Sequence, residues 1–371
     1  MENEINIYSF VERAKQCYLL LQDDLSRKIF EARVILDLDP SLQNIARIVR
    51  LGEQQKWLDA VKKSIPDILH TLKQAPKKLI LYGTNVTGHA LASFFMEENI
   101  DFYGFCGRRA SEFPDGLLGK PVISPDYLFQ HADDFYVILA VGEAIDEIIS
   151  ILRKNHFPQD QILSCFRPES EADHQYFDFP SLFHRGTAFV DGGCLDCRTS
   201  YLFADWCDGE YSKIFAFEPD PVSYAICENN LAGREIRDFH LVRAGLSDHD
   251  GEVTFRSGLY GCSHIAEKDG AEDKNLIAVP VTTIDRTVGA ERVGFIKMDI
   301  EGAEFDALHG AESVIVRDKP LLAISVYHRT GDMLAIMDYL HELVPEYRFW
   351  LRHYSIGVAD TVLYASVDKL S

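Results

Sequence analysis

The chain has 371 residues, 47% hydrophobic and 26% charged, which suits about two or three globular domains and excludes a disordered or collagen-like protein. Its 58 acidic residues outnumber 37 Lys and Arg residues, for a formal net charge of −21. This acidity disfavours nucleic acid and anionic membranes as partners. The sequence has no apolar run of about 18 residues and begins with an acidic stretch, so we expect a cytoplasmic protein without membrane insertion.

Residues 1–75 predict a helical N-terminal segment. Apolar residues recur at steps of three and four over 11–21 and again over 25–36, which is the period of one helix face. Asp39 and Pro40 predict the N-cap and first residue of a further helix. Because the segment has no strands of its own, we expect an appendage or a dimerisation element, and it would support a homodimer.

Residues 76–165 predict a small Rossmann-like α/β domain. Predicted strands and helices alternate in it, with strands at 79–82, 102–106 and 136–140 and helices at 89–96 and 144–153. The turn bounded by Gly83 and Gly88 suits either ligand binding or tight strand–helix packing. The second strand runs into Arg108 without an acidic residue for a ribose, which argues against a dinucleotide there.

Residues 166–184 are polar and aromatic and predict a linker, and residues 185–371 predict a second α/β domain. This domain has seven predicted strands, the last two forming a hairpin: 188–190, 213–218, 239–244, 295–299, 321–326, 347–351 and 361–365. The predicted fold class is therefore α/β, with a helical segment and a smaller Rossmann-like α/β domain before the larger sheet. Ligands of such open sheets bind at the carboxyl ends of the strands.

The first two of these strands end in residues that suit a nucleoside with a charged tail. Asp191 precedes Gly192 and Gly193, so backbone amides can approach a ligand while the carboxylate holds an ammonium group. Glu218 ends the second strand, where a carboxylate can accept both hydroxyls of a ribose. Each acid could instead be only a helix cap or a solvated strand end.

Four further residues complete the predicted cofactor site. Pro219 would cover an adenine with apolar surface, and Ser247 and Asp248 follow the third strand and would meet the adenine edge. Asp299 follows the fourth strand and is expected to hold the methionine end. Sites for an ammonium, a ribose and an adenine together describe S-adenosyl-L-methionine better than a dinucleotide.

Two residues are candidates for a catalytic base: Glu301, after the fourth strand, and His328, after the fifth. Histidine has an ordinary pKa nearer to neutral pH, which favours His328, although this residue follows an apolar strand and could instead be a core histidine. Catalysis by alignment of the acceptor alone is the other alternative. Glu301 could also orient the acceptor or be a first-turn acid. No metal site is predicted, since Mg²⁺ on Asp299 and Glu301 would lack a third ligand, and the pair Cys194 and Cys197 lacks the further ligands of a zinc site.

Five motifs in this domain together resemble the FkbM-type methyltransferases: FVDGG at 189–193, FEPDP at 217–221, GLSDHDG at 245–251, TTID at 282–285 and FIKMDIEGAE at 295–304. The resemblance covers about residues 185–366. It implies a class I methyltransferase sheet and S-adenosylmethionine-dependent O-methylation of a hydroxyl, commonly on a sugar or a polyketide-type product. It also places the loop at 260–264 near the acceptor, and residues 24–30 look like the leader of longer members that modify glycans.

One departure from the family concerns the first glycine loop. The family usually has DVGANIG there, whereas this chain has DGGCLDC at 191–197, which puts side-chain contacts from that loop in doubt.

The sequence predicts an enzyme whose partner is a small-molecule or glycan acceptor. The alternative is a non-catalytic nucleotide or sugar-nucleotide binding protein, or an NAD-dependent oxidoreductase that uses residues 76–165.

Overall fold

The computed structural model describes residues 7–52, 55–141, 145–165, 175–233, 236–257, 264–265, 276–355 and 357–370. The chain divides into two compact units, which we call unit 1 (Met1–Phe30, Asp173–Arg352 and Asp360–Ser371) and unit 2 (Glu31–Ala172 and His353–Ala359). The helical N-terminal segment is therefore shared between the units, whereas the sequence-based boundary lies at residue 75. None of the helices in the described ranges is long and apolar enough to cross a membrane.

Unit 2 is built on a five-stranded parallel sheet with the order β3-β2-β1-β4-β5. This is a doubly wound α/β arrangement, as predicted. The sequence analysis predicted three of the five strands and missed β3 and β5, which are short and have little apolar pattern of their own. The elements are β1 (Lys78–Tyr82), α5 (Val86–Glu97), β2 (Gly104–Cys106), β3 (Val122–Ile123), α6 (Pro125–Gln130), β4 (Phe135–Leu139), α7 (Ile145–Lys154) and β5 (Ile162–Cys165).

The glycine turn of unit 2 is explained by close packing. An added Cβ at Gly83, where φ is +147°, would overlap the carbonyl oxygen of Ala140, and one at Gly88 would overlap that of Gly83. Asn85 caps helix α5 because its Oδ1 accepts the backbone N–H of Gly88 at 3.2 Å. The turn thus brings β1, β4 and α5 together without requiring a ligand.

Two N-terminal helices, α3 (Leu42–Val49) and α4 (Gln55–Gln74), also belong to unit 2. Ile48 and Val61 are buried in the same apolar cluster as Phe95 of α5. Helix α3 begins at Leu42, so the prediction that Pro40 is its first residue is wrong.

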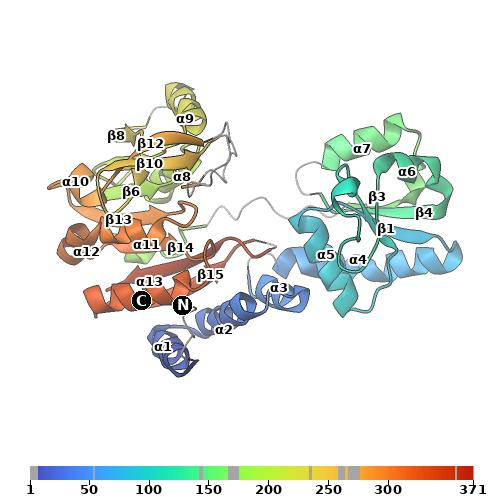
Figure 1. Cartoon of the computed structure of the whole chain (residues 1–371), viewed down its shortest axis with the longest axis horizontal. Coiled ribbons are helices and arrows are strands. Elements are labelled where there is room, and N and C mark those ends of the chain that lie inside the picture. Colours follow the sequence, from blue (N-terminus) through green and yellow to red (C-terminus); the bar gives the residue numbers. More distant parts are fainter. Residues whose placement is uncertain are drawn as a thin grey trace. The chain divides into compact units, whose positions relative to one another are not determined.

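Unit 1 contains a seven-stranded sheet with the order β15-β16-β14-β13-β6-β7-β8 (Figure 1). Strand β16 is antiparallel to β14, and the strands from β14 to β8 are parallel. All seven predicted strands are confirmed, and with them the class I methyltransferase sheet. They are β6 (Ala188–Gly192), β7 (Ile214–Phe217), β8 (Phe239–Val242), β13 (Val293–Met298), β14 (Leu321–Ser325), β15 (Arg348–His353) and β16 (Thr361–Ser366).

The chain changes direction across this sheet between β6 and β13, which are neighbours although about 100 residues separate them. This is the switch point at which open α/β sheets bind ligands. The helices of unit 1 after β6 are α8 (Arg198–Trp206), α9 (Pro221–Gly233), α10 (Ile284–Val288), α11 (Glu304–His309), α12 (Glu312–Asp318) and α13 (Asp332–Leu343).

Unit 1 also has a four-stranded sheet that the sequence did not predict, with the order β11-β10-β12-β9. Its strands are β9 (Gly245–Leu246), β10 (Gly251–Arg256), β11 (His264–Ile265) and β12 (Leu276–Thr282). Pro280 inside β12 and the weak alternation of β10 obscure the strand pattern. Residues 260–263 of the predicted acceptor loop lie outside the described residues.

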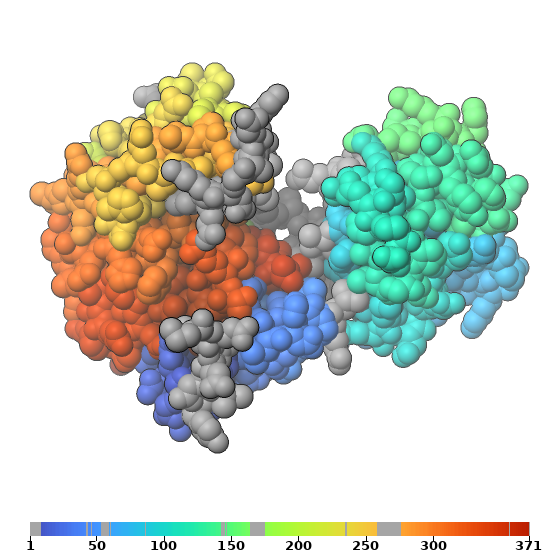
Figure 2. Space-filling view, in the orientation of Figure 1, coloured from blue at the N-terminus to red at the C-terminus, as the bar shows by residue number. Residues whose placement is uncertain are grey.

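Helix α1 (Ile7–Leu20) and the first part of α2 (Asp24–Leu38) pack within unit 1. Helix α1 lies beside α13, and the Cys17 thiol is 3.2 Å from Oδ1 of Asp338. In Figure 2 the blue surface of α1 borders the orange-red surface of the C-terminal part of unit 1. Leu21 forms a β-bridge with Phe349, and the Ser26 hydroxyl accepts the backbone N–H of Leu351 at 2.9 Å. The N-terminal residues therefore complete the edge of the seven-stranded sheet.

We expect Leu21→Ala to lower the free energy of unfolding of unit 1 by about 2–5 kcal/mol, the usual cost of truncating a buried leucine. Leu21 is 1% exposed, whereas Leu19 is 69% exposed and serves as the matched control. Urea unfolding followed by the fluorescence of Trp206 and Trp350, in a Trp57→Phe background, measures the difference. Equal stability of Leu21→Ala and Leu19→Ala would contradict the packing of this segment on unit 1.

Candidate active site

The loop after β6 follows a path that ordinary residues seldom adopt. Gly193, Leu195 and Cys197 have φ values of +75°, +53° and +67°, in the left-handed region. An added Cβ at Gly193 would overlap the carbonyl oxygen of Asp299, and the Asp299 N–H donates to the carbonyl of Gly192 at 3.1 Å. The glycine is thus required because the ends of β6 and β13 are in backbone contact.

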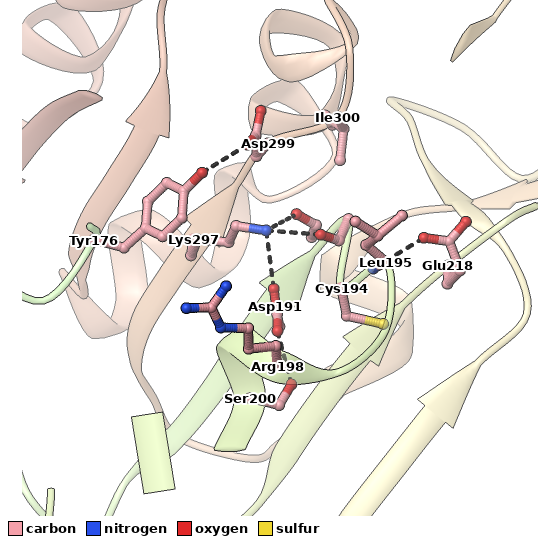
Figure 3. A network of polar contacts seen from close by, with 12 residues as sticks. Tyr176, Asp191, Cys194, Leu195, Arg198, Ser200, Glu218, Lys297, Asp299 and Ile300 are labelled. Atoms are coloured by element: carbon pink, nitrogen blue, oxygen red, sulfur yellow. Dashed lines mark hydrogen bonds and ion pairs between the residues drawn. The ribbon is translucent and has the colours of Figure 1, made fainter. Parts of the chain in front are cut away.

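A buried ion pair joins the same two strands (Figure 3). Nζ of Lys297 lies 3.1 Å from Oδ1 of Asp191, with both side chains at most 2% exposed. The ammonium also donates to the carbonyls of Gly192 and Gly193, at 3.0 and 2.7 Å. Burial disfavours the cation, but the charge of Asp191 nevertheless holds the pKa of Lys297 above its usual value.

This pairing changes the interpretation of Asp191. Its second oxygen, Oδ2, accepts the hydroxyl of Ser200 at 2.7 Å, so both oxygens have partners within the protein. The sequence predicted that Asp191 holds the ammonium group of a ligand, whereas the structure gives it Lys297 instead. The sequence analysis missed Lys297, although a lysine inside an apolar strand is a signal of a buried counter-charge.

Glu218 lies directly after β7 and is buried. Its Oε2 accepts the N–H of Leu195 at 3.1 Å, and its Oε1 accepts the N–H of Asp220 at 2.8 Å. Burial raises the pKa of Glu218 to about 8, although the two backbone N–H donors by themselves would lower it. Each oxygen keeps a further lone pair for a ligand.

Asp220, which the sequence analysis also missed, accepts the Ser257 hydroxyl and the N–H of Val222, both at 2.9 Å.

The residues predicted to meet an adenine lie on the next elements. Pro219 contacts β9, since a Cβ at Gly245 would lie 3.8 Å from its ring. Ser247, just after β9, is buried, and its hydroxyl is 3.2 Å from Oδ1 of Asp248. Asp248 is exposed and lies 2.6 Å from Nδ1 of His249. The structure therefore brings Pro219 and the β9 end together, with the Asp248 carboxylate already engaged by a neighbour.

Asp299, after β13, accepts two phenolic hydroxyls. Tyr176 donates to Oδ2 at 2.6 Å and Tyr327 donates to Oδ1 at 3.2 Å. The Tyr176 ring also lies under the ammonium of Lys297, with 5.2 Å between Nζ and the ring centroid. Tyr176 falls in the predicted linker and carries no pattern that would have marked it for the site.

Three carboxylates surround the imidazole of His328. Nε2 lies 3.4 Å from Oδ1 of Asp299 and 3.6 Å from Oε1 of Glu301, and Nδ1 lies 2.9 Å from Oε1 of Glu304. Burial by itself would lower the pKa of His328, but the carboxylates of Glu301 and Glu304 raise it to about 10. At neutral pH the ring is a cation, so the argument that His328 has a near-neutral pKa does not hold in the folded protein.

Glu301 differs from the other acids of this cluster. Its φ of +56° is unusual for a residue with a side chain, and such strain costs on the order of 1 kcal/mol and is commonly found at functional sites. Its side chain is 28% exposed, whereas that of Glu304 is fully buried. Atoms of Asp299, Glu304 and His328 also lie within 4.8 Å of one another, a spacing open to a metal ion, but the imidazolium already balances their charge.

The site thus has two parts at the carboxyl ends of the central strands. Around β6 and β13 lie the locked glycine loop, Asp299, Glu301 and His328, and after β7 lies Glu218. The first part can neutralise and orient a charged group, and the second can accept hydroxyl groups.

Comparison with known proteins agrees with this arrangement. Residues 187–353 match the family profile described as the methyltransferase FkbM domain. A 2-O-methyltransferase, NoeI of Sinorhizobium fredii (strain NBRC 101917 / NGR234), is 24% identical over 148 residues, which cover 35% of this chain and 59% of NoeI. The matched region thus spans less than two thirds of that relative.

Two solved structures give weaker likenesses. Methyltransferase FkbM from Methylobacillus flagellatus KT has a TM-score of 0.45 at 17% identity and covers 92% of this chain and 99% of its own. A methyltransferase described as putative, SMU.1697c of Streptococcus mutans in complex with SAH, has a TM-score of 0.33 at 12% identity and covers 51% of this chain and 93% of its own. The profile match alone therefore assigns residues 187–353, which hold six of the seven strands of the main sheet, to a methyltransferase FkbM domain.

Proposed function

We propose that this chain is an S-adenosylmethionine-dependent O-methyltransferase whose acceptor is a hydroxyl of a sugar, glycan or related metabolite. The observation that carries the proposal is the position of Glu218, a buried carboxylate at the end of the strand next to the glycine loop, with a lone pair free on each oxygen. The FkbM domain supports methyl transfer, and the name of NoeI supports a hydroxyl acceptor.

The residues at the strand ends fit this cofactor. Glu218 would accept the ribose hydroxyls, Pro219 and Ser247 would border the adenine, and the backbone of Gly193 would approach the amino-acid end. Asp299 would hold that end through its carboxylate, since Asp191 is already paired with Lys297. When bound, S-adenosylmethionine supplies a methyl group on a positively charged sulfur.

The acceptor hydroxyl must be aligned with that methyl group and must lose its proton. Glu301 is the residue we propose as the base, because its carboxylate is 28% exposed, whereas Glu304 is fully buried and the 22% exposed Asp299 already accepts two tyrosine hydroxyls. His328 would act as a positioning residue: as an imidazolium between carboxylates, it holds Glu301 and Asp299 in place. Its own ring has no free lone pair to accept a proton at neutral pH.

The alternative functions have less support. Gly83 and Gly88, the residues on which the NAD alternative depends, are explained by packing in unit 2. The acidic composition still favours a small-molecule or glycan acceptor over nucleic acid.

At pH 9, above the pKa of about 8 and therefore with the Glu218 carboxylate charged, we expect Glu218→Ala to weaken S-adenosylhomocysteine binding by about 1.5–3 kcal/mol, the range for hydrogen bonds to a charged group. Glu228→Ala, at an exposed position on α9, is the matched control and should bind as the wild type does. Calorimetric titration of the full chain measures both. Unchanged affinity in a folded Glu218→Ala variant would remove Glu218 from the site, and binding of NAD without S-adenosylhomocysteine would contradict the function.

We expect Glu301→Gln to lower kcat by about 10²–10⁴-fold, the contribution of a positioned base, while S-adenosylhomocysteine affinity stays within about 0.5 kcal/mol. Release of S-adenosylhomocysteine with a panel of monosaccharides, nucleotide sugars and oligosaccharides first identifies an acceptor and then gives kcat. Near-normal turnover in Glu301→Gln would leave alignment alone as the source of catalysis.

The pH profile distinguishes the two roles at His328. Because the folded pKa of this group is raised to about 10, its positive charge is fully present at neutral pH and is lost as the pH rises through about 10. We therefore expect kcat to show no inflection near 6.5, the ordinary histidine value, and to fall on the alkaline side. In His328→Ala, kcat should drop at least tenfold and the alkaline inflection should disappear. An inflection near 6.5 that His328→Ala removes would assign the base to His328.

A further inference from the structure

Three cysteines of unit 1 converge on one point. Cys194 and Cys197 lie in the loop between β6 and α8, and Cys227 lies in α9. Their sulfur atoms all lie within 4.8 Å of one another, and the sulfurs of Cys194 and Cys227 are 3.8 Å apart. All three side chains are at most 1% exposed. In the sequence, Cys194 and Cys197 lacked further zinc ligands. In the folded chain, Cys227 lies beside them as a third thiol.

The loop adopts strained backbone conformations to place these thiols. Leu195 and Cys197 are left-handed although neither is glycine, and the Cys197 N–H donates to the Cys194 carbonyl at 2.7 Å. Cys197 occupies the N-cap of α8 but makes no side-chain capping bond there, at a position that normally favours Ser, Thr, Asp or Asn. The sulfur therefore faces the other thiols rather than the helix end.

The spacing suits a thiolate-bound metal ion. In a tetrahedral site, zinc–sulfur bonds of about 2.3 Å place two sulfurs about 3.8 Å apart. This is the separation of Cys194 and Cys227. Within the described ranges, these residues form the only all-cysteine group with such spacing. By contrast, buried Cys207 of the same unit bonds through its thiol to the Ala204 carbonyl at 3.7 Å, as a solitary core cysteine does.

We propose that Cys194, Cys197 and Cys227 bind one zinc ion through three thiolates, with water in the fourth position. Each thiol gives its proton to solvent as its Zn–S bond forms, and no electron is transferred. The ion would tie the β6–α8 loop to α9. Leu195, between the two loop cysteines, accepts the Cys227 thiol on its carbonyl at 3.2 Å. Its N–H donates to Glu218 (Figure 3).

Zinc binding itself does not depend on the function proposed above. An effect of zinc on cofactor binding at Glu218 would depend on that function. The test therefore reads the metal directly. The full chain is purified with zinc supplied and without chelators, and elemental analysis should find one zinc ion per chain in the wild type and in the matched control Cys207→Ser. Cys194→Ser and Cys227→Ser should each lose at least nine tenths of it.

Cobalt provides a second readout that needs no variant. Replacing zinc by Co²⁺ in the wild type should produce the thiolate-to-cobalt charge-transfer absorption of a tetrahedral sulfur site. A wild type that binds no zinc and in which all eight thiols titrate freely would overturn the proposal. A wild type that shows fewer than eight titratable thiols, and regains all eight after reduction, would contain a disulfide and would also overturn the proposal. Zinc retained equally by Cys227→Ser and Cys207→Ser, or cobalt bound without charge-transfer absorption, would also overturn it.

Discussion

The buried pair of Asp191 and Lys297 is the interaction on which the rest of the site depends. It joins two neighbouring parallel strands in the middle of the sheet, and removal of either partner would leave a buried charge without compensation, at a cost of about 3–5 kcal/mol. The three donors of the ammonium are taken up by Asp191 and by the carbonyls of Gly192 and Gly193. The direction in which the chain leaves β6 is therefore set by a charge on β13.

From this pair, contacts extend to both parts of the site. On one side the loop continues to Leu195, whose N–H orients Glu218. On the other side Gly193 packs against the backbone of Asp299, which receives the hydroxyls of two tyrosines and lies next to the histidine cation. The part of the site around Glu218 and the part around Asp299 are thus joined through one short stretch of backbone, so a change at Gly193 would disturb both.

Features local in the sequence were predictable and features that depend on distant partners were not. Apolar runs predicted all seven strands of the main sheet, whereas β12, interrupted by Pro280, escaped notice. Asp191 was recognised as important but its partner was not, because Lys297 lies on a strand far along the chain. The protonation of His328 depends on Glu301 and Glu304, which lie in the turn and the helix after β13. The cysteine cluster depends on Cys227 from helix α9.

The packing of α1 and α2 has a consequence for biosynthesis. Ser26 bonds to Leu351, 325 residues away, so unit 1 closes only after β15 has been synthesised. Contacts of such separation slow folding, and a nascent chain must carry the amphipathic helix α1 without its partner during most of translation. Unit 2, whose sheet lies within one continuous stretch, can assemble earlier on the ribosome. The order of folding would then run from the middle of the chain outward, with the catalytic unit completed last.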